Sequence, residues 1–373
     1  MNTTPTHEPT HIETVIIGAG QAGLSTGYHL KQCKRPFVIL DASSRVGDNW
    51  RRQWDTLKLY SPAKYDRLPG LRFPADPWSF PTKDQVGDYL ETYARTFQLP
   101  IQLDTRVESL EALEGGGYRV TTDRGTWTCD NVVVATGTFG RTPKIPAVAE
   151  ELDTSILQMH SSEYRRPGQL RDGPVLVVGA SHSGCDIAYE VAESRPTILA
   201  GRDCGQIPPR LESPAMHLIF PMLVFAWRHI VTRRTPMGRK EMDEVRFHGG
   251  PMLRVKRADL ADRKVERVTS RVEEARDGKP VVDGTPRDVA TVVWATGFRQ
   301  VFDWIKLPIF DDNGWPREMR GVVADAPGLF FCGLSFQYAF SSMVFAGVGR
   351  DARYVADRIN ARSRESIRLP AAA

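Results

Sequence analysis

The sequence lacks an apolar run long enough to cross a bilayer, a C-x-x-C pair of cysteines and a strong net charge. Its five cysteines are scattered, so we expect neither a metal site nor a redox-active thiol pair. Forty-nine basic residues against 45 acidic ones leave a net charge of only +4. That is not the concentrated basic surface of a nucleic-acid-binding protein. A nucleic-acid partner is therefore not expected.

The first dozen residues are polar and do not show the basic and apolar order of a secretory signal. We expect residues 1–11 to form a mobile tail and the protein to be cytoplasmic. A chain of 373 residues is too long for one ordinary core and predicts two domains. Its 41% hydrophobic and 25% charged residues are typical of a globular protein, acting as a monomer or a homodimer.

One segment raises the question of a membrane. Residues 216–227 are almost wholly apolar, include Pro221 and are followed by basic residues up to Lys240. The run is too short to span a bilayer, so we expect a buried helix or a lid over a pocket. Docking of residues 216–240 at a membrane surface, through the apolar face and its basic flank, is the less favoured alternative.

Two strand–turn–helix–strand patterns stand far apart in the chain. In the first, Thr14–Ile17 leads into Gly-Ala-Gly-Gln-Ala-Gly at 18–23, a helix over Leu24–Gln32 and a strand over Pro36–Leu40. In the second, Val175–Val178 leads into the turn 179–184 and then into further helical and strand patterns. The two turns start 161 positions apart. Each pattern is typical of a βαβ unit that binds a dinucleotide.

The first turn has the complete G-x-G-x-x-G spacing. Gly18 allows the sharp turn, Gly20 lets a pyrophosphate approach the backbone, and Gly23 lets helix and strand pack closely. The pyrophosphate is expected at the helix N-terminus, beside Gln21 and Ala22. Asp41 ends the next strand, where a carboxylate accepts from ribose hydroxyls. These residues predict a site for a dinucleotide with a free ribose.

The second turn is less regular, because Ser181 occupies the middle glycine position. We expect the Ser181 hydroxyl to compensate by binding the same phosphate oxygen. Arg202 follows the second strand of this unit and favours a cofactor with a 2′-phosphate, so we expect NADPH rather than NADH. His182 is expected to line the phosphate or to pack locally. The expected cofactor-binding residues of this turn are Gly179, Ser181, His182, Ser183 and Gly184.

A second repeat supports two units. Val-Val-Val-Ala-Thr-Gly at 132–137 and Val-Val-Trp-Ala-Thr-Gly at 292–297 are near-identical strand ends. We expect cofactor contacts from Gly137, Thr296 and Gly297, where these strands end. The predicted fold class is α/β, with two nested Rossmann-like dinucleotide-binding domains. The domain of the first turn is discontinuous, over 12–165 and 286–373, and the domain of the second turn, expected to bind NADPH, is inserted into it over 166–285. A helix over Asp84–Phe97, a hairpin or meander within 101–129, a late strand at 328–333 and a helix over Gly349–Ile359 belong to the first domain.

These features together resemble the flavin-containing monooxygenases, the class B flavoproteins that include the plant YUCCA enzymes and small bacterial relatives. The likeness covers nearly the whole chain. It includes the turn at 18–23, Gly-Asp-Asn-Trp at 47–50, Leu-Tyr-Ser-Pro at 59–62, the second turn, Arg202 and Gly-Leu-Phe-Phe-Cys-Gly-Leu at 328–334. The resemblance implies that Asp48, Trp50 and Gly333 lie at FAD, and that Trp50, Tyr60 and Ser61 lie at the reacting centre.

The sequence also departs from the family pattern. Of the linker fingerprint F-x-G-x-x-x-H-x-x-x-[YFW], only His160 and Tyr164 remain, since Thr154 and Ile156 replace its Phe and Gly. Tyr60 stands where many members carry an asparagine beside the flavin. The resemblance implies oxygen transfer from dioxygen, through a flavin C(4a)-peroxide, to a nitrogen, sulfur or ketone centre of a small molecule. The alternatives are an FAD/NADPH oxidoreductase that passes electrons to an acceptor or to dioxygen, and a non-catalytic flavin redox sensor.

Overall fold

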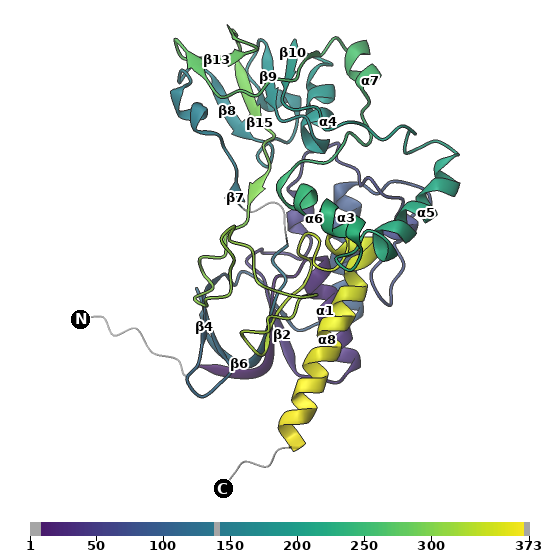
Figure 1. The fold of residues 1–373 in the computed structure, drawn as a ribbon, viewed down its shortest axis with the longest axis vertical. Helices are drawn as coiled ribbons and strands as arrows, with labels where there is room; N and C mark the ends of the chain where they lie inside the picture. The colour runs from purple at the N-terminus through teal and green to yellow at the C-terminus, as the bar shows by residue number, and fades with distance from the viewer. Residues whose placement is uncertain (1–8, 138–141, 369–373) are drawn as a thin grey trace, which may run out of the picture.

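The computed structural model describes residues 9–137 and 142–368. Its two largest sheets occupy the two lobes seen in Figure 1. The seven-stranded sheet has the order β3-β2-β1-β6-β5-β4, with β17 also beside β6. Its strands are β1 (Thr10–Ile17), β2 (Phe37–Leu40), β3 (Ile101–Gln102), β4 (Val107–Ala112), β5 (Tyr118–Thr122), β6 (Gly125–Val134) and β17 (Leu329–Phe331).

The centre of this sheet is parallel. Strand β1 pairs in parallel with both β2 and β6, and β17 pairs in parallel with the last residues of β6. Strands β4 and β5 form an antiparallel hairpin that continues into the first half of β6. Strand β2 is wholly buried, as expected of a parallel strand covered on both faces. The predicted hairpin within 101–129 is confirmed.

Helices cover one face of the seven-stranded sheet: α1 (Gln21–Gln32), α2 (Asp48–Arg51), α3 (Lys83–Thr96) and α8 (Phe345–Arg368). Helix α3 begins at a capping box, in which Thr82 and Gln85 bind each other's backbone. Helix α8 buries Val348, Ala352 and Val355 in the core shared with α1 and α3. This spacing places the three side chains on one helix face. The predicted helices at 84–97 and 349–359 are confirmed, and α8 is longer than expected.

The second sheet has five parallel strands in the order β11-β10-β9-β15-β8. They are β8 (Leu157–His160), β9 (Val175–Val178), β10 (Thr197–Ala200), β11 (Glu266–Val268) and β15 (Thr291–Trp294). Helices α4 (His182–Val191) and α7 (Arg257–Asp262) belong to this unit. The short strands β12 (Ala275–Arg276), β13 (Lys279–Val282) and β14 (Thr285–Pro286) form a small antiparallel sheet.

Two expected boundaries are wrong at the level of strands. Sequence boundaries at 165 and 286 assign β8 and β15 to the first domain, but both strands pair within the second sheet. The reason is that β15 leads into the Ala-Thr-Gly segment that packs behind the second glycine-rich turn, as β6 does for the first. The expected tail over residues 1–11 is also too long, because β1 begins at Thr10. Residues 1–8 lie outside the described part of the chain.

The two lobes are joined by a short antiparallel pair of β7 (Thr142–Pro143) and β16 (Phe298–Arg299). Between β10 and β11 of the second sheet, α5 (Met216–His229) and α6 (Pro236–Phe247) return toward the first lobe (Figure 1). The remaining elements are the 3-10 turns η1 (Ala63–Tyr65), η2 (Ala147–Glu151), η3 (Pro167–Gln169) and η4 (Phe340–Met343). In the described ranges, no helix has both the length and the apolar character needed to cross a membrane.

Candidate active site between two glycine-rich turns

The first glycine-rich turn connects β1 to α1 and is shaped by steric demands of its own backbone. Gly18 has a φ of +109°, and a Cβ there would lie 2.6 Å from the carbonyl oxygen of Ala135. A Cβ on Gly23 would lie 1.8 Å from the carbonyl oxygen of Gly18. A Cβ on Gly20 would have nothing within 4 Å. The outer glycines are therefore required for packing, whereas Gly20 borders open space at the N-terminus of α1.

That open space is a cavity lined by residues from three separate segments. Of the residues expected at FAD, Gly20, Gln21, Asp41, Asp48 and Trp50 line it together. The further lining residues are Ala19, Ser43, Arg45, Gly47, Asn49 and Leu90. Free backbone N–H groups and a helix N-terminus facing such a cavity suit a pyrophosphate. The residues present therefore fit the dinucleotide expected from the sequence.

Asp41 lies at this cavity, but its carboxylate is already engaged with the backbone. Oδ2 accepts from the backbone N–H of Ala19 at 2.6 Å, and Oδ1 accepts from that of Ser43 at 2.8 Å. Asp41 thus fixes the glycine-rich turn to the end of β2. Each oxygen has a further lone pair, so acceptance from a ribose hydroxyl stays a prediction.

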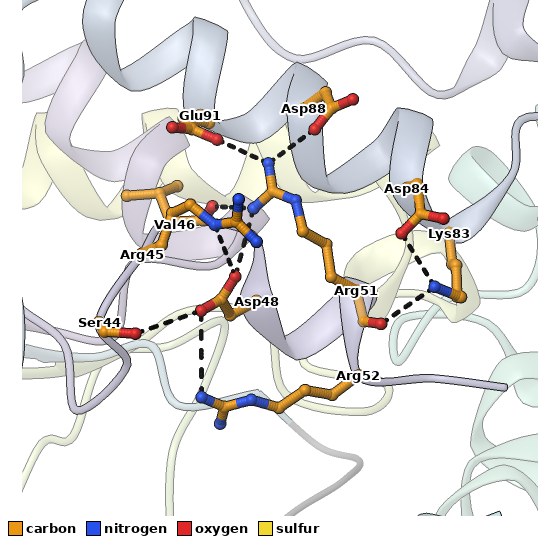
Figure 2. A network of polar contacts seen from close by, with 10 residues as sticks. All are labelled: Ser44, Arg45, Val46, Asp48, Arg51, Arg52, Lys83, Asp84, Asp88 and Glu91. Atoms are coloured by element: carbon orange, nitrogen blue, oxygen red, sulfur yellow. Dashed lines mark hydrogen bonds and ion pairs between the residues drawn. The ribbon is translucent and has the colours of Figure 1, made fainter. Parts of the chain in front are cut away.

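Asp48 is held in place by a network of arginines, shown in Figure 2. Its Oδ1 accepts from Arg45 at 2.9 Å and from Arg51 at 3.4 Å. The other guanidinium nitrogen of Arg51 reaches Asp88 at 2.8 Å and Glu91 at 2.6 Å, both on α3. This network ties α2 to α3 (Figure 2) and presents Asp48 and Trp50 to the cavity.

The second turn repeats the first one in its geometry. Gly179 has a φ of +108°, and a Cβ there would lie 2.3 Å from the carbonyl oxygen of Ala295. A Cβ on Gly184 would lie 1.7 Å from the carbonyl oxygen of Gly179. Ala135 and Ala295 begin the two Ala-Thr-Gly repeats, so each repeat backs one turn. The expected residues of this site, Gly179, Ser181, His182, Ser183 and Gly184, all lie at the junction of β9 and α4.

The hydroxyl of Ser181 donates to the carbonyl oxygen of Gly250 at 2.9 Å. Its expected contact with a phosphate oxygen stays a prediction. His182 packs locally, with its ring centroid 5.4 Å from that of Tyr60. Burial lowers the pKa of His182 to about 4, so its imidazole is neutral near pH 7.

Arg202 lies just after β10, where a 2′-phosphate is expected, and it already has a partner. Its guanidinium binds Oε1 of Glu244 on α6 at 3.0 Å, with 49% and 52% of the two side chains exposed. The other carboxylate oxygen of Glu244 lies 3.1 Å from Nδ1 of His248. Glu244 is 42 residues away from Arg202 in the sequence, and no sequence pattern pointed to it.

The predicted reacting-centre residues lie between the two units. The Tyr60 hydroxyl donates to Oδ2 of Asp186 on α4 at 2.8 Å, and burial raises the pKa of Asp186 to about 6. The Ser61 hydroxyl donates to Oδ1 of Asp66 at 2.5 Å. Burial raises the pKa of Asp66 to about 8, and its other oxygen has no hydrogen-bond partner. Asp66 and Asp186 were missed, because single carboxylates without a motif carry no signal in the sequence.

The remaining predicted residues lie at the junction of the lobes. Nε2 of His160 lies 3.0 Å from the carbonyl oxygen of Gly297, and the hydroxyl of Thr296 donates to the carbonyl of Lys144. Gly137 has a φ of +78° at the end of β6. Gly333 lies beside Ala22, since a Cβ on it would be 2.7 Å from that of Ala22. Gly333 thus lies at the first turn, whereas Thr296 and Gly297 brace the connection between the lobes.

Two glycine-rich turns, each closed by an Ala-Thr-Gly strand on its own parallel sheet, define a two-dinucleotide oxidoreductase. Comparison with known proteins agrees. Residues 15–203 match the family described as pyridine nucleotide-disulphide oxidoreductase. A Geobacillus kaustophilus protein named uncharacterized oxidoreductase CzcO-like is 38% identical, over 93% of this chain and 98% of that protein. The probable indole-3-pyruvate monooxygenase YUCCA9 of Arabidopsis thaliana is 29% identical, over 95% of this chain and 90% of that protein.

A solved structure supports the same relationship to flavin monooxygenases. The flavin-containing monooxygenase of Stenotrophomonas maltophilia is 25% identical and superposes with a TM-score of 0.72, over 95% of this chain and 99% of that one. The chain belongs to the pyridine nucleotide-disulphide oxidoreductase family, and its similarity to flavin monooxygenases supports a place among the flavin-containing monooxygenases. The chain is therefore an enzyme of the flavoprotein monooxygenase type.

Proposed function

We propose that the protein is an NADPH-reduced monooxygenase that transfers one oxygen atom from dioxygen to a nitrogen, sulfur or ketone centre of a small organic molecule. The observation that carries the proposal is the pairing of two unlike sites. The first turn has a carboxylate, Asp41, at the ribose position, and the second has a guanidinium, Arg202, at the end of β10. An acid suits a free ribose and an arginine suits a 2′-phosphate. This difference supports FAD at the first turn and NADPH at the second.

When bound, FAD supplies the chemistry that accepts electrons from the nicotinamide and activates dioxygen. The chain positions the cofactors and excludes water from the reacting centre. Gly20 and the N-terminus of α1 would hold the pyrophosphate, while Asp48 and Trp50 would border the same cofactor. Tyr60 and Ser61 lie on the loop after α2, and the hydroxyl group of each donates to a buried carboxyl group. These contacts fix two hydroxyl groups near the meeting point of the two sites.

An apolar cover that keeps water from the reacting centre favours oxygen transfer over simple electron transfer, because water promotes side reactions of the oxygenating species. The segment around α5 buries Met216, Phe220 and Val224 in an apolar cluster to which Tyr60 and Tyr65 also belong. The described cysteines offer no thiol pair for a reductase: Cys129, Cys185 and Cys332 are buried, and burial raises the pKa of each to about 12. A buried neutral thiol is a poor nucleophile.

The proposal is tested by supplying NADPH with amines, sulfides and ketones in turn, and by measuring oxygenated product and hydrogen peroxide in parallel. Substrate-dependent product formed at the expense of peroxide is the expected result. NADPH oxidation that yields only peroxide would favour an oxidase. Fast electron transfer to an added acceptor without oxygenated product would favour the electron-carrier alternative. If NADPH leaves bound flavin oxidised, the flavin redox sensor becomes the better account.

A further inference from the structure

Helix α5 has an exposed apolar face that neither dinucleotide site explains. The sequence favours a helix buried on all sides or a lid, but only Met216, Phe220 and Val224 are buried. On the outer face, 77% of Leu218, 62% of Met222 and 58% of Phe225 are exposed to solvent. These positions are four and three residues apart, so they form one stripe along the helix. Figure 1 shows α5 at the outer edge of the molecule.

The inner face of α5 is well anchored, which keeps the stripe turned outward. The Phe220 ring lies 5.1 Å from that of Tyr65, and the Trp227 ring lies 5.1 Å from that of Phe340. Directly after the helix, Arg233 binds the fully buried carboxylate of Glu318 at 2.5 Å. Since the helix is fixed from one side and from its end, the stripe is a lasting feature of the surface.

Within residues 213–240, from which the stripe arises, the charges are of one sign, and the exposed acids Glu241, Asp243 and Glu244 begin only after Lys240. Residues 213–240 contain five Lys and Arg residues and no Asp or Glu. Arg234, Arg239 and Lys240 are exposed just beyond the C-terminal end of α5. The His229 ring lies 4.8 Å from that of Phe225, so a further basic residue borders the stripe itself. An apolar helix face with a basic flank complements an anionic surface that has an apolar interior.

We propose that α5 docks this protein on the surface of an anionic phospholipid bilayer, with Leu218, Met222 and Phe225 entering the acyl boundary and the basic flank contacting headgroups. The helix of 14 residues is too short to span, so it lies in the plane of the interface. A second copy of the chain fits the surface less well. A twofold contact through the stripe would pair residues 213–240 with the same segment of the other copy, which offers the basic flank no Asp or Glu. This inference does not depend on the oxygenation chemistry.

The test is sedimentation of the full-length, FAD-loaded protein with vesicles of phosphatidylcholine alone or mixed with phosphatidylglycerol. We expect binding to the mixed vesicles that weakens with salt. Leu218→Asn, Met222→Asn and Phe225→Asn combined should weaken binding by about tenfold or more, because apolar contact with the bilayer is lost. The matched control is Val301→Asn, a change at a 42% exposed apolar residue two positions after β16, which should leave binding unchanged.

A second variant keeps the test valid if the triple variant folds poorly. Arg239→Gln with Lys240→Gln should reduce affinity for the phosphatidylglycerol vesicles by roughly tenfold, with unchanged flavin content. Absence of binding to mixed vesicles, or equal binding by the triple variant and wild type, would overturn the proposal. So would a wild-type dimer in sedimentation velocity that the triple variant converts to a monomer, because α5 would then be a self-association surface.

Discussion

The hydroxyl of Tyr60 donates a hydrogen bond to Oδ2 of Asp186 at 2.8 Å, across 126 positions of sequence. The bond joins the loop after α2 to the helix behind the second glycine-rich turn. Arg254 strengthens the junction, since its guanidinium donates to the carbonyl of Leu59 at 2.7 Å and lies 5.8 Å from the Tyr60 ring. Tyr60 therefore links the first glycine-rich unit to the second.

Replacement of Tyr60 by Phe should weaken this link. The variant leaves a buried carboxyl oxygen of Asp186 without its donor, which costs about 1–3 kcal/mol of unfolding free energy. We also expect slower flavin reduction by NADPH, because the position of α4 depends on the bond. Urea unfolding and stopped-flow absorbance measure the two effects. Tyr65→Phe is the control, since that ring belongs to the same apolar cluster. Equal behaviour of the two variants would contradict the coupling role.

Asp66 should make stability depend on pH. Burial raises its pKa from 3.8 to about 8, so the folded state keeps a proton that the unfolded state releases. Unfolding free energy therefore falls as pH rises from about 4 to about 8, with a slope of at most about 1.4 kcal/mol per pH unit. Between about pH 6 and 8 the wild type should lose up to about 2 kcal/mol.

Asp66→Asn isolates this effect. Asparagine stays neutral and keeps an oxygen that accepts from Ser61, so the decline between about pH 6 and 8 should disappear. Asp186 adds only a small part of the decline above pH 6, because its raised pKa of about 6 places most of its contribution at lower pH. The measurement is chemical unfolding at a series of pH values. A decline of the same size in the variant would show that Asp66 is not the group responsible.

Replacement of Gly20 should weaken FAD binding without lowering the stability of the FAD-free protein. Gly20→Ala places its Cβ in open space at an ordinary φ of −79°, so the FAD-free protein should unfold at an unchanged temperature. Its FAD affinity should fall by about tenfold or more, because the backbone can no longer approach the pyrophosphate. Gly23→Ala should instead destabilise the FAD-free protein, since its Cβ would meet the carbonyl of Gly18 at 1.8 Å. Normal FAD affinity in Gly20→Ala would refute the assignment.

Glu244 should compete with the cofactor for Arg202. The pair is half exposed, so a phosphate can displace the carboxylate. Arg202→Gln should weaken binding of 2′,5′-ADP by about tenfold, and Glu244→Gln should tighten it by about threefold, as measured by calorimetry. Binding of 5′-AMP is the control, because it lacks the 2′-phosphate. Similar affinities of the wild type for 2′,5′-ADP and 5′-AMP would argue against NADPH.

Local patterns predicted the parts of the fold that depend on local geometry. Gly18 and Gly179 predict their turns, because a positive φ with a carbonyl oxygen close to the Cβ position leaves room for glycine alone. The repeated Ala-Thr-Gly strands predict two equivalent units, and in the structure each strand packs behind one turn through Ala135 or Ala295. Periodic apolar residues also identified α3 and α8.

Features that depend on distant segments escaped prediction. Strands β8 and β15 flank the lobe junction, and a short apolar strand does not reveal which of two sheets it joins. Asp66 and Asp186 are defined by burial, which a single carboxylate does not signal. The partner of Arg202 is Glu244 on α6, and only tertiary packing brings that helix to the residue that follows β10. The exposed side of α5 is hidden in the sequence, because its apolar residues occur on all faces.

The central claim is that the second turn holds the reductant for a flavin held by the first. It is tested most directly by mixing NADPH with the FAD-loaded protein without dioxygen, and by following the visible absorbance of the flavin. We predict a saturable loss of absorbance that is faster with NADPH than with NADH and is slowed in Arg202→Gln. A flavin that dithionite reduces but NADPH leaves oxidised would contradict the account.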